Sequence, residues 1–195
     1  FNEDYISKIE ILFYKNRHLL RNDHQLSFYF LLMPAYNRKN DFDKLYILYK
    51  NILEDKIFEP GKGPTMPFML YFYILFSFAE KKTEEAEKFT FKYLKSLNTD
   101  KPEVFYNFSY ALIEFKKKNF EKALEYLSKV EIIFFYFKYH LKILYLQVYY
   151  ELNYTEQAIS MIDSFKHFLK NNKYVPDSLG VNYKKFTDYY IRLLN

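Results

Sequence analysis

The sequence predicts an all-α fold of about ten helices, arranged as antiparallel helical hairpins. Its apolar residues recur at intervals of three and four: Phe120, Ala123, Leu124 and Leu127 form one stripe of a helix. Only 3 glycines and 6 prolines occur among 195 residues, whereas an all-β chain of this length would need many more turn residues. The third observation is a small residue that recurs near the start of alternate helices. Together these patterns outweigh the strand propensity of the 22 Tyr and 22 Phe residues.

The pattern places the helices in order along the chain. We expect an N-terminal helix over about 3–20, four hairpins over 24–54, 66–98, 102–132 and 138–171, and a closing helix over 179–194. Asp41, Thr83 and Asn119 precede apolar stripes and are predicted N-caps, because short polar side chains accept hydrogen bonds from the first amides of a helix. The segment 59–64 contains two glycines and two prolines and is predicted to be a loop.

The two helices of a hairpin differ in pattern. The first helices are apolar almost throughout, which predicts burial on more than one side. The second helices carry a single apolar stripe, and their stripe residues include Phe42, Leu45, Leu48, Tyr49 and Ile52, then Ala86, Phe89, Tyr93 and Leu97, and later Ala158, Met161, Ile162, Phe165 and Leu169. The closing helix is amphipathic and is expected to cap the stack, with inward-facing Tyr183, Phe186, Tyr190 and Leu193.

A register of four equivalent positions organises the hairpins. Leu45, Ala86, Ala123 and Ala158 each follow a short polar turn and an apolar helix, and they are 41, 37 and 35 residues apart. A small side chain at this position lets two antiparallel helices approach closely. The register therefore predicts a stack of hairpins in a single domain over 1–195.

The third hairpin resembles the tetratricopeptide repeat. Over 111–124 it has a small residue, a variable turn, an aromatic residue (Phe120) and then Ala123. The resemblance implies a right-handed α-solenoid whose concave face, formed by the first helices, binds a partner. The fourth hairpin departs by one residue, because Tyr154 lies four positions before Ala158, whereas Phe120 lies three before Ala123.

Other parts of the chain carry weaker resemblances. In the first hairpin Leu45 replaces the alanine, and Pro34 is expected to break the first helix. The C-terminal half, over 141–150, 164–171 and 183–194, resembles a family of uncharacterised bacterial helical-repeat proteins. That resemblance implies the same fold and brings no established activity.

Composition excludes several classes of function. The absence of cysteine rules out disulfides, thiolate metal sites and cysteine nucleophiles. The net charge of +5 is spread over small lysine clusters, so nucleic acid is not the expected partner. The apolar stretch 67–79 is too short to span a bilayer, and 132–150 is interrupted by Lys138, His140 and Lys142. Because the chain starts at Phe1, we expect a fragment of a longer, cytoplasmic protein.

The motifs of common active sites are missing. The segment 61–64 (Gly-Lys-Gly-Pro) does not form a phosphate-binding loop. Such a loop needs a glycine five residues after the first one, followed by Lys and then Ser or Thr, and these residues are missing here. Asp163 and His167 are four residues apart and could share a helix face, but a metal site needs further ligands. No serine has the context of a nucleophile elbow. We therefore expect no enzymatic activity, no catalytic residues, no metal and no cofactor.

The predicted function is that of a non-catalytic interaction scaffold that binds a peptide or protein on its concave face, and the basic net charge makes an acidic partner one option. The candidate partner-binding residues are Arg38, Tyr71, Phe108, Lys116, His140, Gln147 and Tyr150. The alternative for the aromatic residues among them is a place in the core, because rings at helical spacing usually pack against neighbouring helices. The alternative functions are binding of single-stranded RNA and an architectural or sensor role in a larger protein.

Overall fold

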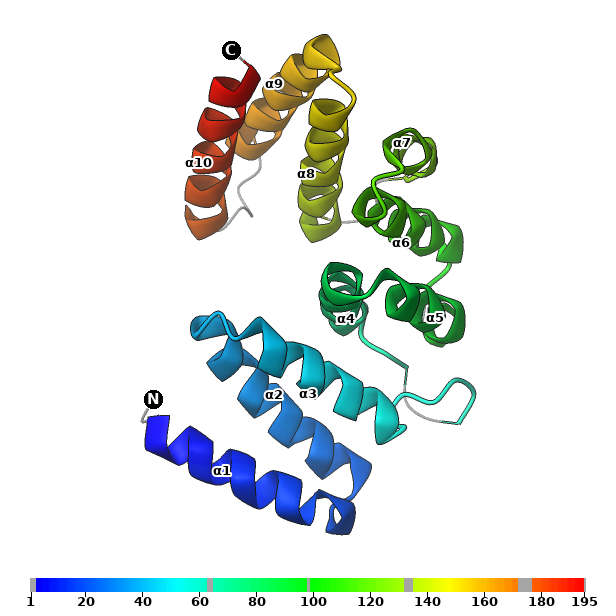
Figure 1. Cartoon of the computed structure of the whole chain (residues 1–195), viewed down its shortest axis with the longest axis vertical. Helices are drawn as coiled ribbons and strands as arrows, with labels where there is room; N and C mark the ends of the chain where they lie inside the picture. Colours follow the sequence, from blue (N-terminus) through cyan, green and yellow to red (C-terminus); the bar gives the residue numbers. More distant parts are fainter. Residues whose placement is uncertain (1–2, 63–64, 98, 132–134, 172–176, 195) are drawn as a thin grey trace. The chain divides into compact units, whose positions relative to one another are not determined.

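The computed structural model describes residues 3–62, 65–97, 99–131, 135–171 and 177–194 (Figure 1). Within these ranges the chain forms ten α-helices and two short 3-10 turns, and it has no strand. The predicted all-α fold and the number of helices are therefore confirmed. None of these helices combines the length and the apolar composition that crossing a membrane requires.

The contacts divide the chain into two compact units, Phe1–Pro102 and Glu103–Asn195. The first unit contains α1 (Glu3–Asn16), the turn η1 (Arg17–Leu19), α2 (Asn22–Arg38), α3 (Phe42–Glu54), α4 (Phe68–Lys81), α5 (Thr83–Tyr93) and the turn η2 (Leu94–Ser96). Each helix packs on the next one along the chain, from α1 to α5. Contrary to the prediction, α2 runs without a break through Pro34, whose side chain is exposed.

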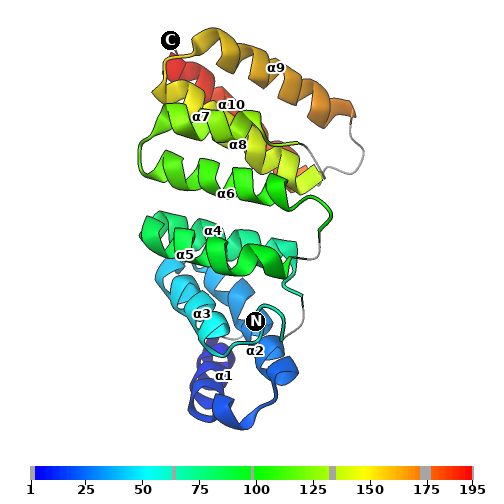
Figure 2. The same cartoon turned by 90° about the vertical axis from the view of Figure 1, so that its right-hand side faces the viewer.

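The second unit contains α6 (Pro102–Lys116), α7 (Phe120–Ser128), α8 (Phe135–Glu151), α9 (Thr155–Asn171) and α10 (Asp177–Leu194). Helices α6 and α7 lie side by side and antiparallel (Figure 2), and α7, α8, α9 and α10 pack in succession. In α10, Tyr183 and Tyr190 are buried as predicted, and the Tyr190 hydroxyl donates to the Leu146 carbonyl at 2.7 Å. Leu193 was predicted to face inward, but it is 63% exposed, because the buried face of α10 continues from Tyr190 to Leu194.

Three of the four hairpins turn in the same way. Asn40, Lys118 and Asn153 have φ angles of 53°, 63° and 58°, in the left-handed region. In each turn the amide of the following residue donates to a carbonyl five residues back, at 2.8–3.0 Å. This geometry is the Schellman motif, which ends a helix and satisfies carbonyls that would otherwise lack a partner. The α4–α5 turn differs, since only Lys82 separates the two helices and its φ angle is −152°.

The predicted register is confirmed by burial and by hydrogen bonds. Leu45 is 4% exposed, and Ala86, Ala123 and Ala158 are completely buried. All four amides donate to the carbonyl of the residue four positions earlier, at 2.9–3.2 Å. Each of these positions therefore begins the first full turn of a second helix, and the fourth hairpin, with Tyr154 four residues before Ala158, keeps this spacing.

Of the three predicted N-caps, only Asp41 caps its helix through its side chain. The Asp41 carboxylate accepts from the Lys44 amide at 3.0 Å, as a cap should. Asn119 occupies the cap position, but its side chain instead donates to Glu114 Oε2 at 2.8 Å. Thr83 is already the first residue of α5, one position beyond the cap.

Candidate binding sites

Two of the predicted partner-binding residues belong to the core. Tyr71 and Phe108 are both completely buried. The Tyr71 ring packs against Phe89 with ring centres 5.0 Å apart, and the Phe108 ring packs against Phe137 at 5.0 Å. Each ring is therefore covered by a neighbouring helix of its own unit and offers no surface to a partner. The alternative reading of these rings as core residues is the correct one.

The other five predicted residues keep some contact with solvent. Arg38, Lys116 and Gln147 are exposed, and Tyr150 is 41% exposed with its ring edge-on to Tyr190. His140 is half-buried, and this burial lowers the pKa of its imidazole. His140 and Gln147 lie two turns apart on α8, so they share a face. None of the five residues lines either of the two hollows described next.

The first hollow is a groove of about 500 Å³ in the first unit, formed chiefly by α3 and α5. It combines an apolar floor with a charged rim. Its lining residues are Lys50, Leu53, Glu54, Lys56, Phe78, Glu85, Lys88, Phe89, Lys92 and Tyr93. Except for Phe78 of α4 and Lys56, which follows α3, these residues come from the second helices of the first two hairpins.

Aromatic rings form the floor of the α3–α5 groove. Phe89 and Tyr93 lie one turn apart on α5 and stack with ring centres 5.3 Å apart. Phe78 of α4 meets Phe89 edge to face at 5.8 Å. All three residues are at most 4% exposed, so the floor is a fixed apolar surface at the edge of the core.

The rim of the groove is positively charged. Lys50 Nζ lies 3.9 Å from a Glu85 oxygen, and Glu85 also lies 3.7 Å from Lys82 Nζ, so this carboxylate is already neutralised. Lys56 and Lys88 form no ion pair with any described residue. The groove therefore presents lysine charge that the protein does not compensate itself.

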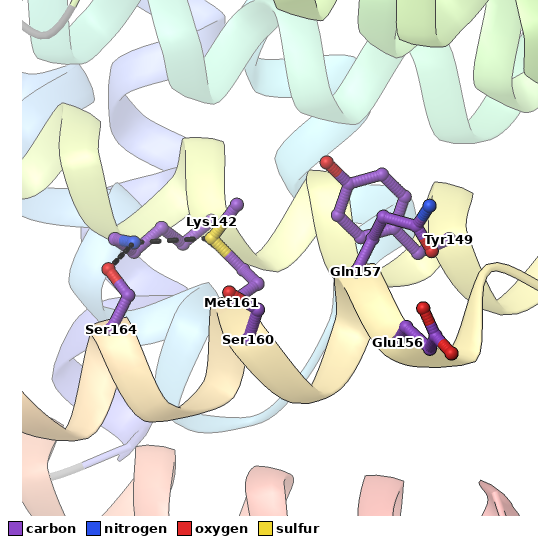
Figure 3. A pocket seen from close by; sticks show the side chains of 7 residues that line it. All are labelled: Lys142, Tyr149, Glu156, Gln157, Ser160, Met161 and Ser164. Carbon is purple, nitrogen blue, oxygen red and sulfur yellow. Dashed lines mark hydrogen bonds between the residues drawn. The ribbon is translucent and has the colours of Figure 1, made fainter.

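The second hollow is a pocket of about 470 Å³ between α8 and α9 in the second unit (Figure 3). Its lining residues are Lys142, Tyr149, Glu156, Gln157, Ser160, Met161 and Ser164. Figure 3 shows Lys142, Met161 and Ser164 together at one end and Glu156 beside Tyr149 at the other end.

Lys142 is the buried charge of this pocket. The residue is only 7% exposed. Its Nζ atom lies 3.1 Å from Ser164 Oγ and 3.2 Å from Met161 Sδ, and it sits over the Phe165 ring at 5.6 Å. Burial is the main cause that lowers the pKa of this amine, and the nearby positive charge of Lys138 lowers it further.

The sequence contains features of both hollows that the predictions above did not use. Lys88 and Lys92 are four apart and alternate with Phe89 and Tyr93, so one stretch of α5 carries both the rim and the floor of the groove. Lys142 stands out as a charge inside an apolar helix, where it counted only as an argument against a membrane span. The sequence does not reveal which helices lie beside these residues.

Comparison with known proteins found no relative of this chain. No protein-family model matches the chain, and no curated protein or solved structure matches it either.

Proposed function

We propose that the chain is a non-catalytic interaction scaffold, built from tetratricopeptide-like hairpins, that binds an acidic and amphipathic segment of a partner protein in the α3–α5 groove. One observation carries this proposal: an aromatic floor and two rim lysines without an ion pair to a described residue, Lys56 and Lys88, occur together in the same hollow. The location differs from the sequence-based expectation, which put the partner on the first helices.

The floor favours apolar anchors from the partner. Phe78, Phe89 and Tyr93 pack on one another and expose little of their area, so together with the half-buried Leu53 they offer a shallow apolar contact to a bound side chain. The stretch of α5 from Glu85 to Tyr93 covers about 12 Å along the helix axis, at 1.5 Å per residue. A partner helix of two to three turns fits this length and would present apolar residues at intervals of three and four.

The rim favours acidic residues beside those anchors. Lys88 and Lys92 project from one side of α5, while Lys50 and Lys56 line the side formed by α3. Carboxylates of a partner would pair with Lys56 and Lys88 without breaking an existing ion pair. Such complementary charge fixes the orientation of the partner and accelerates its association at low salt.

The same groove is less suited to single-stranded RNA. Proteins that bind single strands stack bases on exposed aromatic faces. Phe78 and Phe89 are only 4% and 3% exposed and keep their faces against other rings. The exposed carboxylate of Glu54 also lines the groove and would repel a phosphate backbone.

Selection from a random peptide library against the whole chain tests the proposal. The enriched peptides should be acidic, with apolar residues at helical spacing, and their affinity should fall as salt is added. Lys88→Glu/Lys92→Glu should weaken them at least tenfold. The matched double reversal Lys184→Glu/Lys185→Glu, at exposed sites on α10, should bind as the wild type does.

Two results would contradict the proposal. One is enrichment of peptides without excess acidic residues, and the other is equal weakening by both double reversals. Tighter binding of a mixed single-stranded RNA than of the selected peptides, with a steep salt dependence, would favour the nucleic-acid alternative instead.

A further inference from the structure

Lys142 is unusual among the lysines of this chain. A lysine on a helix normally extends its ammonium group into water, but Lys142 is 7% exposed. Within the described residues its polar contacts are Ser164 Oγ and Met161 Sδ, and it forms no ion pair with a carboxylate. The described residues bring one further charge to bear on it, the positive charge of Lys138.

This arrangement does not serve stability. Removing an ammonium group from water is unfavourable unless a counter-ion and hydrogen bonds compensate for the lost hydration. A methionine would fill nearly the same volume beside Met161 and Phe165 without that cost. A buried charge of this kind, at the edge of a pocket, points to a ligand.

The pocket supplies a set of hydrogen-bond donors at the Lys142 end. An ammonium group has three N–H donors, and two protein acceptors, Ser164 Oγ and Met161 Sδ, lie near it. Because Ser164 Oγ accepts from Lys142, the serine hydroxyl keeps its own proton available for donation. Ser160 lines the same pocket one turn earlier on α9. These groups can surround one oxyanion.

We propose that the α8–α9 pocket binds a single oxyanion, either a carboxylate or a phosphate group of a small ligand, between the Lys142 ammonium group and the Ser164 hydroxyl. This site lies in the second unit and does not depend on the function proposed for the α3–α5 groove.

The far end of the pocket restricts the ligand. Glu156 lies eight residues before Ser164 on α9, which is about 12 Å along the helix axis. Glu156 forms no ion pair with a described residue, so its negative charge faces the pocket uncompensated. Gln157 and Tyr149 line the pocket at the same end as Glu156 (Figure 3). A neutral or positively charged remainder of the ligand is therefore favoured over a chain of several anions.

Titration of the whole chain, followed by nuclear magnetic resonance, tests this site. The probes are inorganic phosphate, acetate and tripolyphosphate, each at constant ionic strength set with sodium chloride. The backbone amides of Ser160 and Ser164 and the Lys142 side chain should shift saturably with phosphate, with acetate or with both. The stronger of the two identifies the source of the anion. Tripolyphosphate should bind no more tightly than phosphate, because Glu156 opposes the additional charges.

Three variants make the test specific. Lys142→Met should lose the saturable shifts while melting at a temperature no lower than that of the wild type. Ser164→Ala should weaken binding severalfold and leave the fold intact, which keeps the test valid if Lys142→Met folds poorly. Lys166→Met removes an equal charge from an exposed position on α9 and should bind as the wild type does.

The proposal is overturned by any of four results. These are the absence of saturable shifts with both simple anions, equal shifts in the wild type and Lys142→Met, unchanged affinity in Ser164→Ala, and tighter binding of tripolyphosphate than of phosphate. The last result would indicate general surface electrostatics in place of a defined site.

Discussion

Buried tyrosines should make the fold sensitive to alkaline pH. Five of the buried tyrosines have a hydroxyl whose pKa is raised by burial above its ordinary value of 10.0. They are Tyr29, Tyr36, Tyr49, Tyr183 and Tyr190. For Tyr190, burial raises the pKa to about 12, with a smaller contribution from Tyr150.

The sign of the effect follows from proton binding. In the unfolded chain a tyrosine ionises near pH 10, whereas these five keep their protons in the folded chain at that pH. Above pH 10 the folded state therefore binds more protons, and the free energy of unfolding falls as pH rises. Each buried tyrosine should remove about 1.4 kcal/mol by pH 11, and the five together about 7 kcal/mol. This sum is comparable with the whole stability of a typical domain, about 5–15 kcal/mol.

A pH titration followed by far-ultraviolet circular dichroism and by tyrosinate absorbance measures this effect. Helix content should stay constant up to about pH 10 and then fall cooperatively within one to two pH units. Tyrosinate absorbance should rise in two phases, first for exposed tyrosines and then together with unfolding.

Tyr190→Phe provides the matched test, and Tyr189→Phe, at a 65% exposed neighbour, is its control. Above pH 10 the slope of stability against pH should be shallower by about 1.4 kcal/mol per pH unit in Tyr190→Phe only. If all 22 tyrosines ionise in one step near pH 10 while the helices persist, the reasoning is wrong. Buried rings would then reach solvent without unfolding.

Three further substitutions probe the hairpin contacts, each measured by urea unfolding. Glu114→Gln should cost about 1–2 kcal/mol, because its amide has one uncharged acceptor oxygen, whereas the buried carboxylate accepts from both Asn119 Nδ2 at 2.8 Å and Lys122 Nζ at 3.2 Å; unchanged stability would show that the ion pair does not contribute. Ala123→Leu should cost about 1–3 kcal/mol, since the completely buried register position has no room for three more carbons; tolerance there would argue against close helix contact. Tyr29→Phe removes a buried hydroxyl that donates to Asp55, so a loss of about 1.5–3 kcal/mol is expected, and a loss below 0.5 kcal/mol would contradict this role.

The helices and their register could be predicted because their signals are local. An apolar stripe such as Ala158–Ile162–Phe165 fixes one face of a helix, and the structure buries all three residues. A similar local pattern did not reveal the Schellman turns, since one of their left-handed positions is Lys118, a residue type with no preference for that conformation. Left-handed lysines are set by the helix contacts on either side, which only the folded chain provides.

The binding surfaces were less predictable because exposure depends on neighbouring helices. Tyr71 and Tyr106 both lie on apolar first helices, yet one is completely buried and the other is 41% exposed. The pattern of apolar residues around each tyrosine does not indicate which of the two is buried. Likewise, Lys88 becomes part of a candidate binding site only because aromatic rings of α5 and residues of α3 line the same groove.

Ion pairing separates two groups of lysines in this protein. Lys44 of α3 pairs with Glu10 of α1 at 2.9 Å, and Lys122 of α7 pairs with buried Glu114 of α6. These lysines join helices, so their removal should weaken the fold and leave ligand affinity unchanged. Lys88 and Lys142 have no carboxylate partner among the described residues, and both line hollows. Their removal breaks no ion pair, so the loss should fall on binding while the fold keeps its stability.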